Sequence, residues 1–237
     1  MQNLQYSALE RIRVTRPTDR LAYLERCAEG KLVFDLGALD ETAYQAKQTT
    51  RHWLHARLCR TANSVVGIDN SSLVPDEGLA TASNGRIVRE NIFDLQPIID
   101  KYGIPDLIVA GELIEHLPDT SSLLASLKAT RALNGVELVV TTPNACCWHN
   151  TLVGLASRES MHKDHLQIYS YKTLRTLFER ADLQIDELLP YRARFPEMIE
   201  GSSSMASASA RIFQALVNGL ETVSPILSAG WIVRARI

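Results

Sequence analysis

The chain has 237 residues, a length that suits one large domain or two small ones. Hydrophobic residues make up 46% and charged residues 22%, so the chain can bury a full core and is not disordered as a whole. The 25 Lys and Arg nearly balance the 27 Asp and Glu, which argues against a protein that holds nucleic acid by bulk positive charge.

The cysteines and the apolar segments exclude other classes. None of the four cysteines forms a C-x-x-C pair, and Cys146 and Cys147 are adjacent, so neither a disulfide scaffold nor a zinc ribbon is expected. No stretch approaches the roughly 18 apolar residues of a membrane span, and the first 20 residues have no apolar signal core. We expect reduced thiols, a cytoplasmic location and no stable membrane insertion.

Short apolar runs alternate with segments of helical period along the whole chain. Asp19 or Thr18 can cap the first helix, and the apolar positions of the last helix are expected to pack on the sheet. In chain order we expect a helix at 20–27, strand at 32–36, helix at 51–62, strands at 64–69 and 87–88, helix at 95–101, strand at 106–111, helix at 121–133, strand at 136–142, helix at 170–181, strand at 183–189, helix at 206–222 and strand at 231–237. This alternation predicts an α/β fold with a mostly parallel sheet and helices on both of its faces.

No linker divides the chain. We therefore expect a single domain over residues 1–237, with an N-terminal helical cap at 1–29. The polar segment 145–169 is expected to form a loop over the site, because loops carry function on such scaffolds.

Polar residues and glycines follow five of the expected strands. Ligands of open parallel sheets bind outside the carboxyl ends of the strands, so these positions predict one common site. They are Asp35 and Gly37, Asp69, Asn91, Gly111 and Glu112, and the run Thr142-Pro143-Asn144.

Two of these residues have a specific expected role. A carboxylate at the end of the second strand, here Asp69, is placed to accept hydrogen bonds from the two hydroxyls of a ribose. The alternative for Asp69 is a helix cap or a turn. Gly37 allows a ligand to approach the backbone closely, and the alternative is an ordinary turn after the strand.

Four segments together carry a resemblance to a known family. They are Val33-Phe-Asp-Leu-Gly37, Val66-Gly-Ile-Asp69, Asp106-Leu-Ile-Val-Ala-Gly-Glu-Leu-Ile-Glu-His116 and Thr141-Thr-Pro-Asn144. Over residues 30–190 the sequence resembles the class I S-adenosylmethionine-dependent methyltransferases. The similarity is greatest to the branch of ubiquinone-biosynthesis-type enzymes and of methyltransferases from glycan and natural-product clusters.

The resemblance implies a fold, a cofactor and a set of site residues. The fold is a Rossmann-like, doubly wound, seven-stranded sheet whose last strand is antiparallel, and the cofactor is S-adenosyl-L-methionine. Glu115 and His116 would brace the site. The cofactor-binding residues would be Asp35, Gly37, Ala110, Gly111 and Glu112 at the methionine part, Asp69 at the ribose, and Asn70, Asn91 and Ile92 at the adenine.

One position departs from the family pattern. The first loop reads Asp35-Leu-Gly-Ala-Leu-Asp40, with Leu39 where the family has its second glycine. This side chain would crowd the cofactor, or the loop would take another path. The chain is similar to a subgroup that lacks the same glycine and carries a Trp-Leu-His on the next helix, as at Trp53–His55. A non-catalytic or regulatory binding module with an altered loop is the alternative to an active enzyme.

The expected reaction is O-methylation of a small molecule or glycan with a histidine as general base. An oxygen acceptor of high pKa benefits from a base, and the pKa of histidine lies near neutrality. His165 is the first candidate and His162 the second. The alternative is that both are solvated loop residues, or that one bonds Asp164. A nicotinamide-dependent oxidoreductase is disfavoured because no G-x-G-x-x-G follows the first strand.

No metal site is expected, because Cys146, Cys147, His149, His162 and His165 match no ordered ligand spacing. The expected partner is the small-molecule or glycan acceptor and not nucleic acid. A homodimer stays open.

Overall fold

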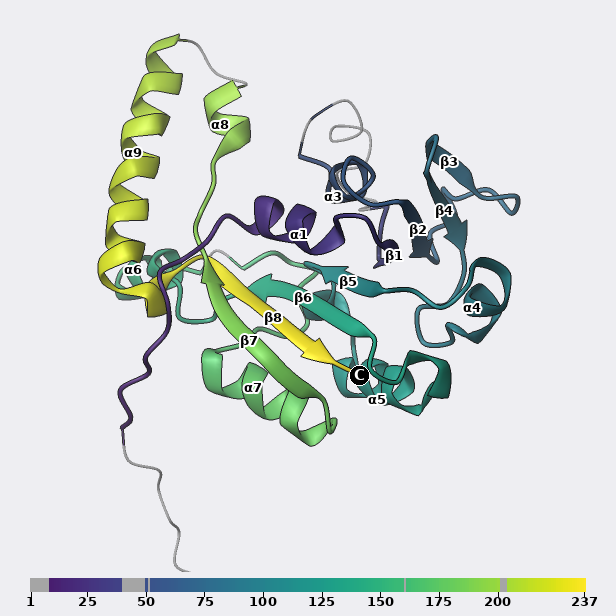
Figure 1. Cartoon of the computed structure of the whole chain (residues 1–237). Helices are drawn as coiled ribbons and strands as arrows, with labels where there is room; N and C mark the ends of the chain where they lie inside the picture. The colour runs from purple at the N-terminus through teal and green to yellow at the C-terminus, as the bar shows by residue number, and fades with distance from the viewer. Residues whose placement is uncertain (1–8, 40–49, 51, 160, 201–203) are drawn as a thin grey trace, which may run out of the picture.

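The computed structural model describes residues 9–39, 50, 52–159, 161–200 and 204–237. Within these residues one sheet has the strand order β3-β4-β2-β1-β5-β6-β8-β7 (Figure 1). The strands are β1 (Leu32–Leu36), β2 (Ser64–Asp69), β3 (Leu79–Ala82), β4 (Gly85–Arg89), β5 (Leu107–Gly111), β6 (Glu137–Pro143), β7 (Gln184–Tyr191) and β8 (Gly230–Arg236). The α-helices are α1 (Arg20–Ala28), α3 (Leu54–Leu58), α4 (Gln96–Tyr102), α5 (Thr120–Ala129), α6 (Trp148–Leu155), α7 (Tyr171–Arg180), α8 (Pro196–Glu200) and α9 (Ser204–Val223).

The strand directions confirm the Rossmann-like, doubly wound fold. Strands β4, β2, β1, β5 and β6 run parallel, and β8 lies antiparallel between β6 and β7. The sheet has one strand more than the seven expected, because β3 pairs antiparallel with β4 at the edge. The sequence gives little sign of β3, since its four residues are small or half-exposed and show no apolar run.

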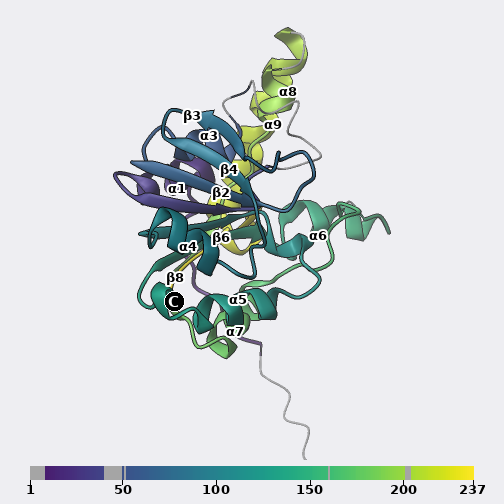
Figure 2. The same cartoon turned by 90° about the vertical axis from the view of Figure 1, so that its right-hand side faces the viewer.

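Helices cover both faces of the sheet, as predicted (Figures 1 and 2). Successive side chains of a strand point to opposite faces. Thus Val33 of β1 packs with Leu24 of α1 and Leu58 of α3 in one core cluster. The next residue, Phe34, belongs to the cluster that contains Leu123 and other residues of α4, α5 and α7.

The predicted helices are present at the expected places, but some of their first and last residues differ from the prediction. Asp19 is the cap of α1, because its side chain accepts a hydrogen bond from the Ala22 amide. Helix α3 is shorter than the predicted 51–62. Helices α6 and α8 were not predicted: α6 lies in the segment 145–169, which was expected to be a loop, and α8 has only five residues.

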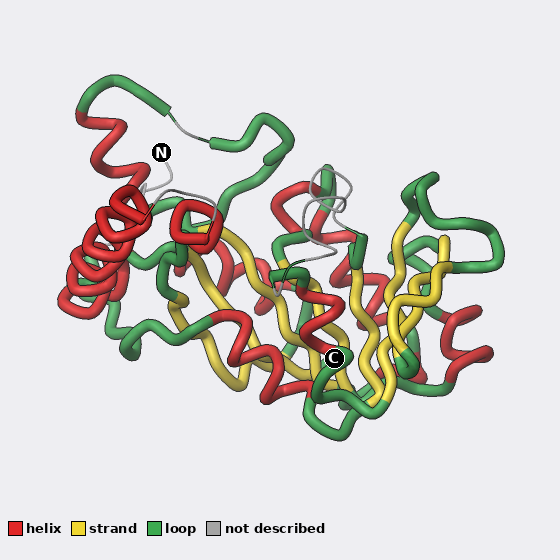
Figure 3. The backbone as a smooth tube through the Cα atoms, turned by 90° about the horizontal axis from the view of Figure 1, so that it is seen from above, coloured by secondary structure: helices red, strands yellow, loops and turns green. Residues whose placement is uncertain are grey.

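The expectation that the last helix packs on the sheet was largely wrong. Figures 1 and 3 show α9 at one end of the sheet rather than over either face. Ile212 and Leu216 are 65% and 68% exposed, whereas Val217 is buried. No helix in the described residues is long and apolar enough to cross a membrane.

Asn144, directly after β6, ties two parts of the chain together. Its fully buried side chain donates hydrogen bonds to the carbonyls of Ile226 (2.8 Å) and Ser228 (2.9 Å). Its amide oxygen accepts from the Cys146 backbone N–H at 2.9 Å. The Thr-Pro-Asn run therefore fixes the end of β6 to the segment that precedes β8.

We expect Asn144→Ala to lower the free energy of unfolding by about 2–4 kcal/mol, because it leaves several buried backbone groups without a partner. Urea unfolding measures this. Asn150→Ala is the matched control, since the Asn150 side chain makes only long contacts of 3.5 and 3.4 Å. Equal losses in the two variants would contradict the role assigned to Asn144.

Candidate functional site

The predicted cofactor residues lie at the carboxyl edge of the parallel strands. Strand β1 pairs with β2 on one side and with β5 on the other, so Leu36 has Ile68 and Ala110 as its register partners. The residues that follow these positions are Gly37, Asp69 and Gly111. The order of strands reverses at this point, which is where ligands of such sheets bind.

The backbone at Gly37 favours a glycine. Its φ is +69°, and a Cβ there would lie 2.7 Å from Cδ1 of Leu113. The tight turn after β1 therefore depends on this residue.

Asp69 presents its carboxylate at the end of β2 and is 9% exposed. Oδ1 accepts a hydrogen bond from the Ser71 N–H and Oδ2 accepts one from the Leu39 N–H, both at 2.9 Å. The bond to Ser71 is the turn role that was the alternative for this residue. Because each carboxylate oxygen has a second lone pair, the turn bonds leave room for two hydroxyl donors.

Leu39 does not crowd the edge of the sheet. Its side chain is fully buried and packs with Trp53, Val74 and Ile87. The Trp53 indole N–H also donates to the Ala38 carbonyl at 3.0 Å, which holds the loop against α3. The missing second glycine is thus accommodated by turning the side chain into the core. Residues 40–49 lie outside the described residues.

Asp35 is bound to a histidine beneath the surface. His55 Nδ1 lies 3.0 Å from Asp35 Oδ2, and the two side chains are 0% and 2% exposed. The other ring nitrogen, Nε2, is 2.9 Å from the Thr81 hydroxyl. Burial alone would lower the pKa of His55, but Asp35 and Cys59 outweigh it and raise this pKa to about 9. The pairing was not predicted, although His55 was noticed as part of Trp-Leu-His.

The remaining predicted residues differ in exposure. Asn70 and Asn91 are exposed at the ends of β2 and β4, and Ile92 is half-buried. Asn91 Oδ1 accepts from the Phe93 N–H at 3.0 Å. Ala110 is buried, whereas the two residues that follow it, Gly111 and Glu112, are partly exposed at the end of β5.

Glu112 is held by residues that the sequence did not point to. Its backbone has a positive φ of 54°, and its N–H donates to the Thr141 carbonyl at 2.9 Å. The Tyr191 hydroxyl lies 3.1 Å from both carboxylate oxygens, and Arg20 Nη1 is 3.6 Å from Oε1. Strand β7 and helix α1 thereby fix this carboxylate at the end of β5.

A cluster of three histidines forms next to Glu115. The carbonyl of Glu115 accepts hydrogen bonds from the N–H groups of Leu166 (2.8 Å) and Gln167 (3.1 Å), which anchors the preceding loop. The ring of His165 comes to lie 4.8 Å from that of His116 and 5.4 Å from that of His162. The structure thus brings both predicted histidines together and adds His116. We call these three residues the histidine cluster.

Glu115 and His165 have unusual electrostatic surroundings. Glu115 is 1% exposed, its Oε2 accepts from the Thr142 hydroxyl at 3.1 Å, and its Oε1 has no hydrogen-bond partner among the described residues. Burial and the charge of Glu112 raise the pKa of Glu115 to about 8. Burial, followed by His116 and His162, lowers the pKa of His165. Both effects favour the neutral form of the His165 imidazole.

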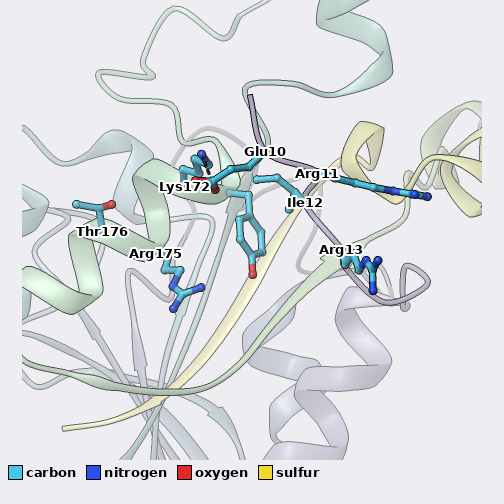
Figure 4. Close-up of a pocket in the computed structure, with 8 residues that line it drawn as sticks. Glu10, Arg11, Ile12, Arg13, Lys172, Arg175 and Thr176 are labelled. Carbon is cyan, nitrogen blue, oxygen red and sulfur yellow. Dashed lines mark ion pairs between the residues drawn. The ribbon is translucent and has the colours of Figure 1, made fainter. Parts of the chain in front are cut away.

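A separate pocket lies between the N-terminal arm and α7 (Figure 4). It has a volume of about 460 Å³, and none of the predicted cofactor residues lines it. Lys172 at its rim forms an ion pair with Glu10 at 2.9 Å. The pocket is distinct from the edge at which the polar residues converge.

One comparison with known proteins identifies a family. The sequence model of a family described as a methyltransferase domain matches residues 11–188. A comparison with curated proteins finds no match.

Solved structures share the fold at low identity. A SAM-dependent methyltransferase from Archaeoglobus fulgidus is 14% identical, with a TM-score of 0.53 and 92% of each chain covered. The small RNA methyltransferase HEN1 is 13% identical, with a TM-score of 0.54, over 98% of this chain and 27% of HEN1. Magnesium protoporphyrin IX methyltransferase (ChlM) from Synechocystis PCC 6803, with bound SAH, is 14% identical, with a TM-score of 0.50, over 91% and 78% of the two chains.

The buried pair of Asp35 and His55 predicts a pH dependence of stability. The pKa of His55 is higher in the folded chain, about 9, than the ordinary 6.5. Protonated His55 therefore stabilises the folded chain fully below pH 6.5. This contribution to the free energy of unfolding falls between pH 6.5 and 9 and is lost above that range. We expect the urea midpoint of the native chain to fall more steeply from pH 6.5 to 9 than that of His55→Gln. His149→Gln, at an exposed position, is the control and should follow the native profile. Parallel profiles for the native chain and His55→Gln would refute the assignment.

Proposed function

Since the chain belongs to the methyltransferase-domain family and uses S-adenosylmethionine, we propose that it methylates an oxygen atom of a small molecule or glycan. The observation that carries this proposal is the histidine cluster, which lies at the edge of the sheet that also holds Gly37, Asp69 and Glu112. A proton acceptor beside the cofactor is what transfer to a hydroxyl requires.

The residues at the edge fit the cofactor from one end to the other. Gly37 forms the tight turn after β1 that the cofactor would lie against, and Asp69 retains lone pairs for the ribose hydroxyls. In this proposal the exposed Asn70 and Asn91, with Ile92, border the adenine, and Gly111 and Glu112 border the methionine part. Asp35 and Ala110 act from beneath, where Asp35 steadies the first loop through His55.

The chain has to orient two reactants and remove one proton. When bound, S-adenosylmethionine supplies a methyl group activated by its sulfonium charge, so the acceptor oxygen forms a bond to the methyl carbon as the carbon–sulfur bond breaks and S-adenosylhomocysteine leaves. Alignment of donor and acceptor provides much of the acceleration. The acceptor proton goes to a histidine of the chain.

His165 is the proposed group at the acceptor oxygen, and His162 is the second candidate. The neutral form of His165 can accept a proton, and its buried Nδ1 has no hydrogen-bond partner among the described residues. His162 is more exposed and lies 3.6 Å from the Asp164 carboxylate, which is the alternative noted from the sequence.

We treat residues 1–237 as one methyltransferase domain, with 1–29 as its cap and 145–169 as its active-site loop. Arg20 of the cap reaches Glu112 at 3.6 Å, which supports a place for the cap at the site. Trp148 of the loop packs against Phe213 of α9 at 5.8 Å. The nearly balanced charge of the chain supports a small acceptor over nucleic acid.

Asp69→Ala should weaken the binding of S-adenosylhomocysteine by about 1–3 kcal/mol, because it removes hydrogen bonds from a charged acceptor. Calorimetric titration of the folded variant measures the loss. Asp186→Ala is the control, since Asp186 lies on β7 and pairs with Arg236 of β8, away from the ends of the parallel strands that hold Asp69. Unchanged affinity in Asp69→Ala would remove Asp69 from the ribose site.

His165→Ala should lower turnover about 10²–10⁴-fold, because the acceptor loses its general base. The affinity for S-adenosylhomocysteine should stay within about twofold of the native value, since no cofactor contact is removed. The assay follows the formation of S-adenosylhomocysteine with phenols and sugars as acceptors. Transfer at the native rate by the variant would exclude His165 as the base, and the same assay on His162→Ala would then test the second candidate.

A further inference from the structure

Helix α9 carries two stripes of residues on opposite sides. The first stripe is buried or half-buried against the rest of the chain and contains Ser207, Ala210, Gln214, Val217 and Glu221. The second stripe lies on the other side of the helix and every one of its residues is exposed. We call it the outer stripe, and it consists of Met205, Ser209, Ile212, Leu216, Gly219 and Val223.

The outer stripe leaves large apolar side chains in water. Met205 and Val223, at its two ends, are 80% and 86% exposed, and Ile212 and Leu216 at its centre are similarly open. The helix stands at one end of the molecule with the sheet on its other side (Figures 1 and 3). Extended exposed apolar surface of this kind marks an interaction site more often than chance.

The spacing of the outer stripe is that of a coiled-coil seam. Its successive residues are four, three, four, three and four positions apart, which is the a and d pattern of the heptad repeat. A helix that packs only on its own chain needs one apolar face, and α9 already has one in its inward stripe. The outer stripe therefore fits a further helix.

We propose that α9 pairs antiparallel with α9 of a second copy of this chain. The order of large and small residues along the outer stripe is the same in both directions, so the stripe is complementary to itself. A twofold axis beside position 214 places Met205 of one copy opposite Val223 of the other, Ser209 opposite Gly219, and Ile212 opposite Leu216. Each contact then occurs twice, as an isologous interface requires.

Gly219 is explained by a close neighbour. A glycine inside a helix is unfavourable relative to alanine. A Cβ at Gly219 would meet nothing within 4 Å, so the packing of the chain on itself does not require a glycine there. In the proposed pair Gly219 lies opposite Ser209, and these two small residues let the helix backbones approach each other closely between the layers of large side chains.

The charges of α9 favour a second copy over a membrane surface. Arg211 and Glu221 are its only charged residues, and Glu221 is buried in the inward stripe. No charged residue lies in the outer stripe or directly beside it at the e and g positions, so two copies bring no like charges together. A helix that lies on a membrane is typically rich in Lys and Arg on its polar face, and α9 has a single Arg.

The test is sedimentation equilibrium of the full chain and of two complementary variants. We expect the native chain to be a dimer. Ile212→Lys and Leu216→Glu should each weaken dimerisation at least about 100-fold, because each dimer would hold two unpaired charges in its apolar centre. An equimolar mixture of the two variants should regain the dimer. In the mixed pair the introduced lysine lies opposite the introduced glutamate, and the other central layer keeps Ile212 against Leu216.

Ile104→Lys is the matched control, since Ile104 is 56% exposed and lies between α4 and β5, far from α9 (Figure 1). It should dimerise as the native chain does, and circular dichroism verifies that every variant is folded. A native chain that stays monomeric up to about 100 µM would overturn the proposal. Single variants that dimerise like the native chain would overturn it too. Monomeric single variants whose mixture stays monomeric would exclude the antiparallel register.

Vesicles of phosphatidylcholine and phosphatidylserine test the other occupant of the outer stripe. The native dimer should remain in solution when the vesicles are sedimented, because its apolar stripe is covered. A monomer that sediments with the vesicles and loses this binding in Ile212→Lys would replace the second copy by a membrane surface. The proposal does not rest on the proposed function, since pairing through α9 uses none of the residues assigned to the cofactor or the acceptor.

Discussion

The common direction of β4, β2, β1, β5 and β6 is the constraint on which the rest of the structure depends. Parallel strands end at the same edge, and the strand order reverses around β1, which is where ligands of such sheets bind. Gly37, Asp69 and Gly111 therefore become neighbours although they lie far apart in the sequence. The hydrogen bond from the Gly37 N–H to the Ile68 carbonyl (2.8 Å) and the bond from Leu39 to Asp69 then join the ends of β1 and β2.

The common direction of the strands also explains which site residues could be predicted from the sequence. A residue that ends an apolar strand can be placed at the edge from periodicity alone, which is why Asp69 and Gly37 were correctly located. The direction of a loop side chain has no such signal: the sequence shows that Leu39 replaces a glycine, but not that it turns into the core. Tyr191 and Arg20 contact Glu112 across 79 and 92 residues of sequence, so no local pattern could reveal them. Strand β3 was not predicted because its residues are small or partly exposed, and it is recognised only from its antiparallel pairing with β4.

Two carboxylates three residues apart have different surroundings, and this difference divides the edge into two parts. Glu112 is neutralised from outside its own segment, by the Tyr191 hydroxyl and the nearby Arg20 guanidinium. Glu115 is more deeply buried; its Oε2 accepts from the Thr142 hydroxyl, and its Oε1 has no hydrogen-bond partner among the described residues. The first carboxylate is thus already compensated by protein groups and suits a polar part of a ligand. The second keeps its proton to a higher pH, because burial and the charge of Glu112 raise its pKa to about 8.

The position of His165 is set by hydrogen bonds at the two ends of the segment that contains it. At one end, Asn144 is bonded to the segment before β8, and the Ala145 N–H donates to the Tyr169 carbonyl at 2.9 Å. At the other end, the carbonyl of Glu115 holds the two residues after His165. Between these ties, helix α6 buries no residue. The histidine cluster is therefore held by backbone hydrogen bonds at the base of the segment and does not depend on the packing of α6.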